Sequence, residues 1–129
     1  MGRILTILVA LITTGTAAHA TTLAAGAIFG GPDQNNAVCY LYNAGDSTVS
    51  VSGSKIVRQN FGPVVPLSTN NCDTDALAPG NICAISVRIV DNVAHACKFV
   101  IGPDSAAATV RGTLEVRSGN NVLKNAELR

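Results

Sequence analysis

Tryptophan is absent from the chain, histidine occurs twice, and the four cysteines form no C-x-x-C pair. Downstream of residue 20 only His95 is left, so a zinc site built from cysteine and histidine ligands has little support. No G-x-S-x-G motif is present, and no segment keeps a 3.6-residue hydrophobic period over three turns. These absences argue against a zinc module and against a serine hydrolase with that motif. They also predict essentially no helix beyond the leader.

An excess of charge of either sign is missing as well. The chain has nine Lys and Arg against eight Asp and Glu, so removal of Arg3 with the leader leaves eight of each. Nucleic acids and anionic membranes are bound by clustered Lys and Arg side chains. We therefore expect no nucleic-acid partner.

Residues 1–20 have the order of a secretory signal peptide. Arg3 supplies a positive start, residues 4–12 are apolar apart from Thr6, and residues 18–20 form an A-x-A cleavage signal. This apolar run is far shorter than the about twenty residues that span a bilayer, and no cysteine follows it to accept a lipid. We expect cleavage after residue 20, one domain over residues 21–129, no membrane insertion, and a periplasmic or secreted location.

The cysteines predict a disulfide framework. All four lie within residues 21–129, at Cys39, Cys72, Cys83 and Cys97. An even number of cysteines in a short exported chain indicates disulfides, and four cysteines allow three pairings. We expect two disulfides and no free thiol.

Alternating apolar and polar residues predict strands along most of the domain. The clearest strand covers residues 109–117, and a second covers residues 83–89. Further strands are predicted over residues 21–29, 37–42, 48–58, 94–101 and 122–128. The alternation places Cys39, Leu41, Val49 and Val51 inward, and Tyr40 and Tyr42 on the opposite face.

Three segments interrupt this pattern. Gly53 indicates a bulge within the strand over residues 48–58. Residues 61–67 contain two prolines, which cannot donate to a strand ladder, so an edge strand or a packed loop is predicted there. Residues 73–75 are interpreted as a polar turn before Pro79-Gly80.

Seven to eight short antiparallel strands in a domain of this size predict an all-β, immunoglobulin-like sandwich of two sheets. In such domains a disulfide joins the second strand to a late strand of the other sheet, and Cys39 and Cys97 occupy those places. This placement favours a Cys39–Cys97 disulfide and leaves Cys72 and Cys83 to close a loop. Two antibody hallmarks are missing, because tryptophan is absent and His95 stands where a tyrosine is usual.

Four strings resemble small exported bacterial β-sandwich proteins of unknown function. They are residues 39–45 (CYLYNAG), 77–83 (LAPGNIC), 97–99 (CKF) and 110–117 (VRGTLEVR). The L-x-P-G-x-x-C string is also similar to one in bacterial immunoglobulin-like envelope domains. Because these strings are turns, cysteines and strand faces, the resemblance implies a fold and an exported location but no activity.

Catalytic and metal chemistry find little support. His95 is the one ordinary general base near neutral pH downstream of the leader, and it shares a face with Cys97, which favours a partly buried structural histidine. Asn70, Asn71, Asp73 and Asp75 gather oxygen donors but lack the glycine and terminal glutamate of a calcium loop. Asn and Asp also favour turns, which we prefer here. We expect no enzyme, no catalytic residue, no metal and no cofactor.

Surface recognition is the remaining possibility. Tyr40 and Tyr42 are candidate contact residues, although cross-strand packing also explains such a pair. The outward row Arg111, Thr113, Glu115 and Arg117, with Arg88 and Lys98 beside it, mixes both charges and is interpreted as a solvated sheet face.

The sequence thus favours an exported, non-enzymatic envelope or extracellular interaction or accessory domain with an unknown protein partner. The candidate contact residues are Tyr40, Tyr42, Asp73 and Asp75. The alternative is a small disulfide-stapled secreted inhibitor or effector that binds another protein through residues 72–83. A fimbrial subunit is a weaker third hypothesis, because residues 122–128 supply the chain's own last strand.

Overall fold

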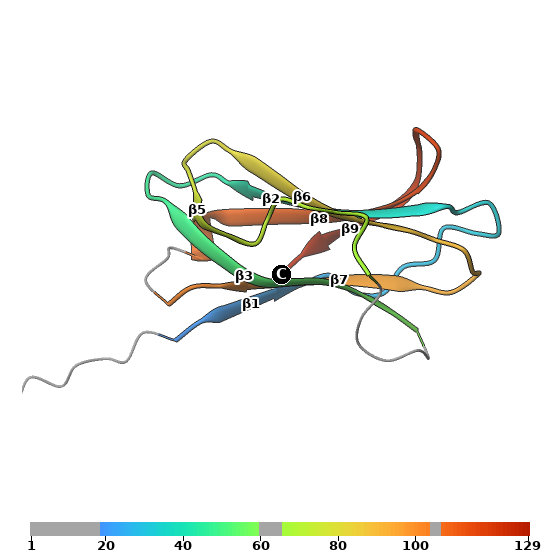
Figure 1. Ribbon diagram of the computed structural model, residues 1–129, viewed down its shortest axis with the longest axis horizontal. Coiled ribbons are helices and arrows are strands. Elements are labelled where there is room, and N and C mark those ends of the chain that lie inside the picture. Colours follow the sequence, from blue (N-terminus) through green and yellow to red (C-terminus); the bar gives the residue numbers. More distant parts are fainter. Residues whose placement is uncertain (1–18, 60–65, 104–106) are drawn as a thin grey trace, which may run out of the picture.

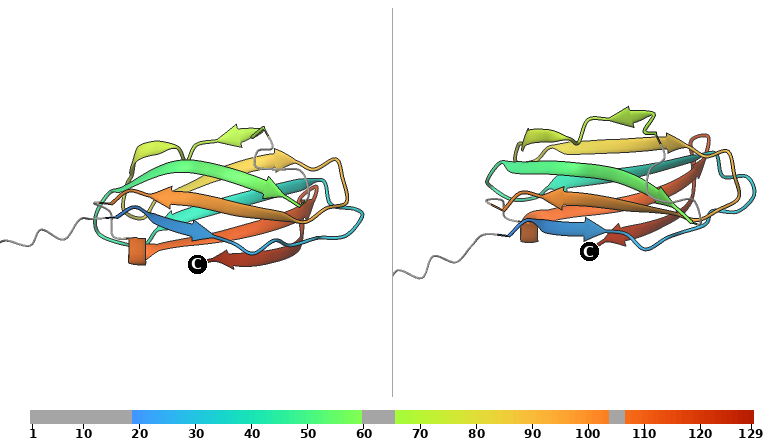
Figure 2. Two further views of the ribbon diagram at one scale, coloured as in Figure 1. Left: turned by 90° about the horizontal axis from the view of Figure 1, so that it is seen from below. Right: turned by 60° about the horizontal axis from the view of Figure 1, so that its bottom comes forward.

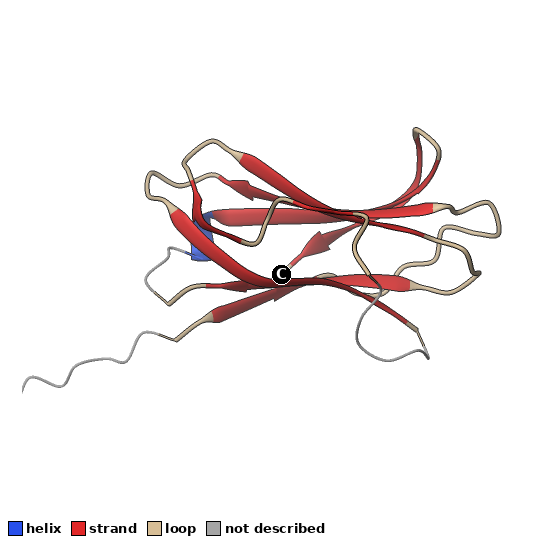
Figure 3. Ribbon diagram, viewed as in Figure 1, coloured by secondary structure: helices blue, strands red, loops and turns tan. Residues whose placement is uncertain are grey.

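Two antiparallel sheets pack face to face in the computed structural model, which describes residues 19–59, 66–103 and 107–129. Its strands are β1 (Thr21–Ala24), β2 (Asn36–Asn43), β3 (Val49–Arg58), β4 (Thr69–Asn70), β5 (Thr74–Leu77), β6 (Ile82–Arg88), β7 (His95–Ile101), β8 (Val110–Ser118) and β9 (Asn121–Leu128). Within the described ranges the helical structure is one 3₁₀ turn, Ala107–Thr109 (Figure 3). The predicted all-β two-sheet sandwich is confirmed.

The four-stranded sheet has the order β1-β7-β3-β5, and the five-stranded sheet has the order β4-β6-β2-β8-β9. Figure 1 shows β2, β6 and β8 in one layer and β1, β3 and β7 in the other. The order is set by hairpins and crossovers, since β2 pairs with both β6 and β8 although β3 follows it in sequence. This places β2 at the centre of the five-stranded sheet.

The two sheets are joined along both edges of the sandwich, by the chain at one edge and by hydrogen bonds at the other. Along one edge β4 ends the five-stranded sheet and β5 ends the four-stranded sheet, and Figure 2 shows the two strands in succession. Along the other edge lie β1 and β9, and Ala24 and Arg129 exchange two backbone hydrogen bonds of 3.0 and 3.1 Å. The edge strands are therefore short or tied to the opposite layer, which limits edge-to-edge pairing.

The core confirms the predicted strand faces. The inward apolar residues of β2, β3, β6 and β7 are at most 3% exposed, among them Cys39, Leu41, Val49, Val51, Cys83, Ile85, Val87, Cys97, Phe99 and Ile101. Their intervening neighbours on β6 and β7 are half-buried or exposed. Period-2 alternation predicted this because one face of each sheet meets the other sheet and the opposite face meets water.

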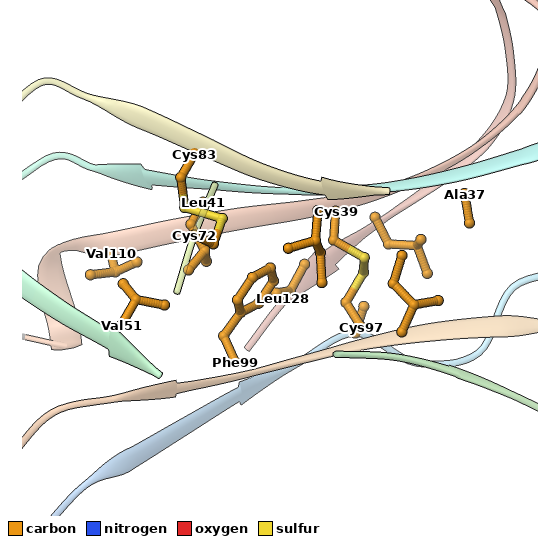
Figure 4. Close-up of a cluster of buried hydrophobic side chains, with 14 of the residues drawn as sticks. Ala37, Cys39, Leu41, Val51, Cys72, Cys83, Cys97, Phe99, Val110 and Leu128 are labelled. Carbon is orange, nitrogen blue, oxygen red and sulfur yellow. A yellow bond between two sulfur atoms is a disulfide. The ribbon is translucent and has the colours of Figure 1, made fainter. Parts of the chain in front are cut away.

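Both disulfides join residues in the way that the immunoglobulin-like placement favoured. Cys39–Cys97 connects β2 to β7 across the two layers, with the Cα atoms 6.1 Å apart (Figure 4). Cys72–Cys83 closes a segment of 11 residues in sequence separation, and no cysteine is free. Because disulfides persist in oxidising environments, the pair indicates a location outside the cytoplasm.

Several local predictions need correction. The described part contains nine strands instead of seven or eight. Residues 73–75 were predicted as a turn, but Thr74–Leu77 forms β5, because the segment reaches the edge of β3 and pairs with it. The first strand ends at Ala24 instead of continuing to residue 29, and beyond it Ile28 makes an isolated bridge to His95.

Other predictions fall outside the described ranges. These are the signal peptide up to residue 18, most of the predicted edge strand or loop over residues 61–67, and part of the loop after Gly102. Within the described residues, none of the helical structure has the length and apolarity needed to cross a membrane.

The predicted bulge at Gly53 is confirmed and has an electrostatic consequence. Gly53 has a φ of 59°, and the β3–β7 register shifts between Ser52 and Lys55. After the shift Lys55 lies directly opposite Lys98 on the outer face of the four-stranded sheet, and both are half-buried. Lys98 was predicted beside the row from Arg111 to Arg117, which is wrong, because that row lies on β8 in the other sheet.

Reversing the charge of one lysine of this pair should stabilise the fold. Like charges directly opposite on paired strands are destabilising, and an opposite pair is favourable. We expect Lys98→Glu to raise the free energy of unfolding by about 0.5 kcal/mol, measured by urea denaturation at low salt. Lys124→Glu is the control, because Lys124 is exposed and pairs with Val116. Equal effects of the two substitutions would contradict this interpretation.

Candidate interaction surface

The outer face of the five-stranded sheet carries an exposed apolar row. Ile82 on β6 lies opposite Tyr42 on β2, and Tyr42 lies opposite Arg111 on β8. Ile82 is 64% exposed and Tyr42 is 42% exposed. We call Ile82, Tyr42, Tyr40 and Arg111 the tyrosine surface.

Tyr40 is the fixed member of this surface. It is half-buried, and the guanidinium of Arg117 lies over its ring at 5.8 Å from the centroid. Arg117 also forms an ion pair with Glu115, with Nε donating to Oε2 at 2.8 Å. The hydrogen bond from Arg117 to Glu115 raises the pKa of Arg117 above its usual value. Tyr40 is therefore held by a stacked and paired arginine, whereas Tyr42 presents its ring to solvent.

A shallow pocket of about 340 Å³ lies between these side chains. It is lined by Tyr40, Tyr42, Ile82, Arg111, Gly112, Thr113 and Glu115. A Cβ on Gly112 would meet the Tyr40 carbonyl oxygen at 2.9 Å and methyl carbons of Leu41 and Leu128 at 3.0 Å. Glycine thus allows β8 to approach β2 closely beneath the pocket, which has charged groups at its rim and aromatic walls.

A buried amide sets the position of the tyrosine surface. Asn43, which ends β2, is fully buried, and its Nδ2 donates to the carbonyls of Ser47 at 2.8 Å and Leu77 at 2.9 Å. Its Oδ1 accepts from the backbone N–H of Gly45 at 3.0 Å. Its backbone also exchanges hydrogen bonds with Gly80 and Asn81, immediately before Ile82. Asn43, the residue after Tyr42, therefore fixes the two connections from β2 to β3 and from β5 to β6, and the second leads into Ile82.

Asp73 and Asp75 do not belong to this surface. Asp73 Oδ1 accepts from the backbone N–H of Ser54 on β3 at 3.0 Å, and Oδ2 accepts from Asn70 Nδ2 at 2.6 Å. Burial raises the pKa of Asp73, but the hydrogen bonds from Ser54 and Asn70 outweigh it and leave the pKa below its usual value. Asp75 lies in β5, and its side chain is outside the described part. The predicted contact residues thus separate into two places.

The side-chain oxygens of Asn70, Asn71 and Asp73 accept hydrogen bonds within the fold. Asn70 Oδ1 accepts from the N–H groups of Cys72 and Asp73, and Asn71 Oδ1 accepts from Ala84 at 2.6 Å. The Asn70 bonds close a local turn, and the Asn71 bond holds the Cys72 end of the disulfide segment to β6. Among the side chains that the structure describes, no group of three or more His, Cys, Asp and Glu is placed to hold a metal ion.

His95 is a buried side chain at the start of β7, as predicted from its alternation with Cys97. It is 2% exposed, and its Nδ1 lies 3.0 Å from the Val93 carbonyl. A carbonyl can only accept, so Nδ1 carries the proton of the neutral ring. Burial lowers the pKa of His95, with opposing contributions from Asp91 and the Val93 carbonyl and a lowering contribution from Arg58.

This environment predicts a pH dependence of stability. The folded protein binds a proton on His95 more weakly than the unfolded chain does. The free energy of unfolding therefore decreases as the pH falls below about 6.5. We expect the urea midpoint to decrease from pH 7 towards pH 5. His95→Asn should flatten that slope, since its amide keeps a donor to Val93 but does not titrate. The stability that ionised Asp73 contributes is lost only at lower pH, below about pH 4. An unchanged slope in His95→Asn would contradict the assignment.

Comparison with protein-family models, curated proteins and solved structures gives no match to this chain. The site must therefore be argued from its own geometry. Sequence reasoning identified Tyr40 and Tyr42 but missed Ile82. Its signal was present, because Ile82 alternates with the inward Cys83 and so lies on the outer face. Its pairing with Tyr42 depends on the β2–β6 register.

Proposed function

We propose that the protein is an exported, non-enzymatic interaction domain that binds a protein partner through the tyrosine surface. The observation that carries the proposal is the adjacency of Ile82 and Tyr42. They are direct cross-strand neighbours, and both are exposed on inner strands of a sheet whose other face packs against the core. Contiguous exposed apolar side chains on a soluble domain mark interaction sites more often than single ones do.

The chemistry of the surface supports a protein partner. Tyrosine and arginine are enriched at the energetically dominant centre of protein interfaces. Tyr40 and Tyr42 supply two such rings, Ile82 adds aliphatic area, and Arg111 and Glu115 give charged groups at the rim. Because the side chains project from paired strands, little ordering is needed on binding.

An exported location is supported by two independent features. Residues 1–20 have the composition of a signal peptide. Both disulfides also require an oxidising compartment to persist. We propose the periplasm or the extracellular space, at the cell envelope or beyond it.

A non-enzymatic role is supported by how the reactive side chains are used. All four cysteines are in disulfides, which leaves no thiolate for nucleophilic catalysis. His95, the single histidine after the leader, is buried and bonded to a backbone carbonyl. These groups serve the fold.

The alternative function, a stapled inhibitor that uses residues 72–83, keeps one specific observation in its favour. The distal part of this segment, residues 79–82, is exposed and ends at Ile82. Its first half is part of the sandwich, with Cys72 and Leu77 buried and β5 paired to β3. The two proposals thus share Ile82 and differ in whether Tyr42 or the Pro79–Asn81 turn provides the neighbouring contacts.

Affinity capture from an envelope extract tests the proposal. The oxidised protein is used as bait and compared with Tyr42→Ala and Ile82→Asn variants, with Val90→Asn as the matched control. Val90 is 81% exposed and follows the opposite end of β6. We expect a partner retained by the parent and by Val90→Asn, and weakened about tenfold or more by either other variant.

The outcomes separate the two functions. Loss of the partner in Tyr42→Ala supports the sheet surface. Retention in Tyr42→Ala together with loss on replacing residues 79–81 by Ser-Gly-Ser supports the inhibitor mode. A partner that is retained equally by all variants contradicts both.

A further inference from the structure

The same sheet face carries a second, chemically different hollow at the other end of β2. It has a volume of about 430 Å³. Its walls include Asn36, Ser68, Ser86, Arg88 and Asn120, and none of the described residues that line it is aromatic or acidic. The tyrosine surface is aromatic with mixed charge, whereas this hollow offers amides, hydroxyls and one guanidinium. We call it the Arg88 pocket.

Backbone hydrogen bonds from Asn35 build the walls. Its N–H donates to the Arg117 carbonyl at 2.8 Å, and its carbonyl accepts from Ile89 at 2.9 Å. Its Oδ1 accepts from the N–H of Gly119 at 3.0 Å, at the tip of the β8–β9 hairpin. Gly119 has a φ of 57°, which lets this tight turn form. The hairpin and the end of β6 are thus both tied to one residue, which makes the hollow a fixed feature of the fold.

The charge of the pocket is positive and uncompensated. Asn36 lies between Arg88 and Arg117 on the two neighbouring strands. Arg117 is neutralised by Glu115. In the part of the chain that the structure describes, the ion pairs involve Arg58, Arg117 and Arg129, so the Arg88 guanidinium has no acidic partner.

We infer that the Arg88 pocket binds a small acidic sugar, with a carboxylate on Arg88 and ring hydroxyls on the neighbouring polar groups. A guanidinium presents paired N–H donors that match a carboxylate in a bidentate arrangement. The amides of Asn36 and Asn120 and the hydroxyls of Ser68 and Ser86 both donate and accept, as sugar hydroxyls require. The pocket volume accommodates one sugar ring, and its described walls offer no aromatic platform for a neutral sugar.

This inference does not rest on the proposed protein partner. The two sites lie at opposite ends of β2, since Asn36 begins the strand and Tyr42 is near its end. A variant in one site therefore leaves the other intact, and the two proposals fail separately.

An NMR titration of the ¹⁵N-labelled, oxidised protein tests the Arg88 pocket. The probes are glucuronate, glucose and acetate. Glucuronate carries both the carboxylate and the ring hydroxyls, glucose carries hydroxyls without a carboxylate, and acetate carries a carboxylate without hydroxyls. We expect saturable shifts of the amides of Asn36, Ser86, Arg88 and Asn120 with glucuronate at about millimolar Kd. Glucose and acetate should bind about tenfold more weakly.

Two matched variants locate the binding. Arg88→Gln should weaken glucuronate binding about tenfold or more, because the charged donor is lost. Arg111→Gln should have no effect, since Arg111 is exposed on the same face but lines the tyrosine surface. Both side chains project from folded strands, and an unchanged amide spectrum without ligand shows that each variant folds.

Three results would overturn the inference. No saturable shift with glucuronate up to about fifty times the expected Kd would remove the site. Equal affinity for acetate and glucuronate would show that the sugar hydroxyls do not contribute to binding. Unchanged affinity in Arg88→Gln would show that glucuronate does not bind in the Arg88 pocket.

Discussion

Replacing Cys39 and Cys97 together by alanine is expected to lower the free energy of unfolding by about 4 kcal/mol. The disulfide spans 58 residues of sequence and joins the centres of the two sheets. In the chain-entropy account, such a long closed loop strongly restricts the unfolded chain. Figure 4 shows the bond crossing the core beside Phe99, so its loss also leaves an incompletely filled space between the layers.

Urea denaturation of the double variant measures this effect, and the second disulfide provides the comparison. Cys72 and Cys83 are separated by 11 residues, for which the same account gives about 3 kcal/mol. A domain of this size has a net stability of only about 5–15 kcal/mol, so the Cys39–Cys97 variant should unfold near room temperature or at low urea. A larger loss in the Cys72–Cys83 variant would contradict the order that loop length predicts.

The Asn43→Ala substitution should be nearly as damaging, at about 3 kcal/mol. It leaves the buried carbonyl of Leu77, the carbonyl of Ser47 and the N–H of Gly45 without their side-chain partner. Buried polar groups that lose their partner are not rehydrated in the folded state, which is why each one costs more than a net hydrogen bond contributes. The measurement is again urea denaturation, with the disulfides intact.

Asn125→Ala is the control for this experiment. Asn125 is exposed on β9, and its replacement should change the free energy of unfolding by less than about 0.5 kcal/mol. Asn43→Asp gives a second check, because a carboxylate would face two carbonyl oxygens and should destabilise the protein more at neutral pH than in acid. If Asn43→Ala stays within about 1 kcal/mol of the parent, the two connections are held by their backbone contacts alone.

The candidate site shows which features the alternation within a strand predicts and which it does not. Tyr40 and Tyr42 were placed on an outer face because alternation with Cys39 and Leu41 leaves them no other side. Asp73 was also predicted as a contact residue, but its carboxylate accepts from Ser54 on the other sheet, so it lies apart from the two tyrosines. Alternation says which face a residue is on within its own strand, but it does not say which strands are neighbours.

The sequence by itself determined the longer strands, their buried faces and the sulfur chemistry, because each depends on residues that are neighbours along the chain. Alternation at Val110–Ser118 and the bulge at Gly53 are examples that the structure confirms. Only the tertiary structure decided the partners. Ile82 meets Tyr42, Lys55 faces Lys98, and Arg88 has no acidic partner among the described residues because of strand order and register. Those are set by the packing of the whole core, in which a shift of one residue would turn every side chain of a strand to the other face.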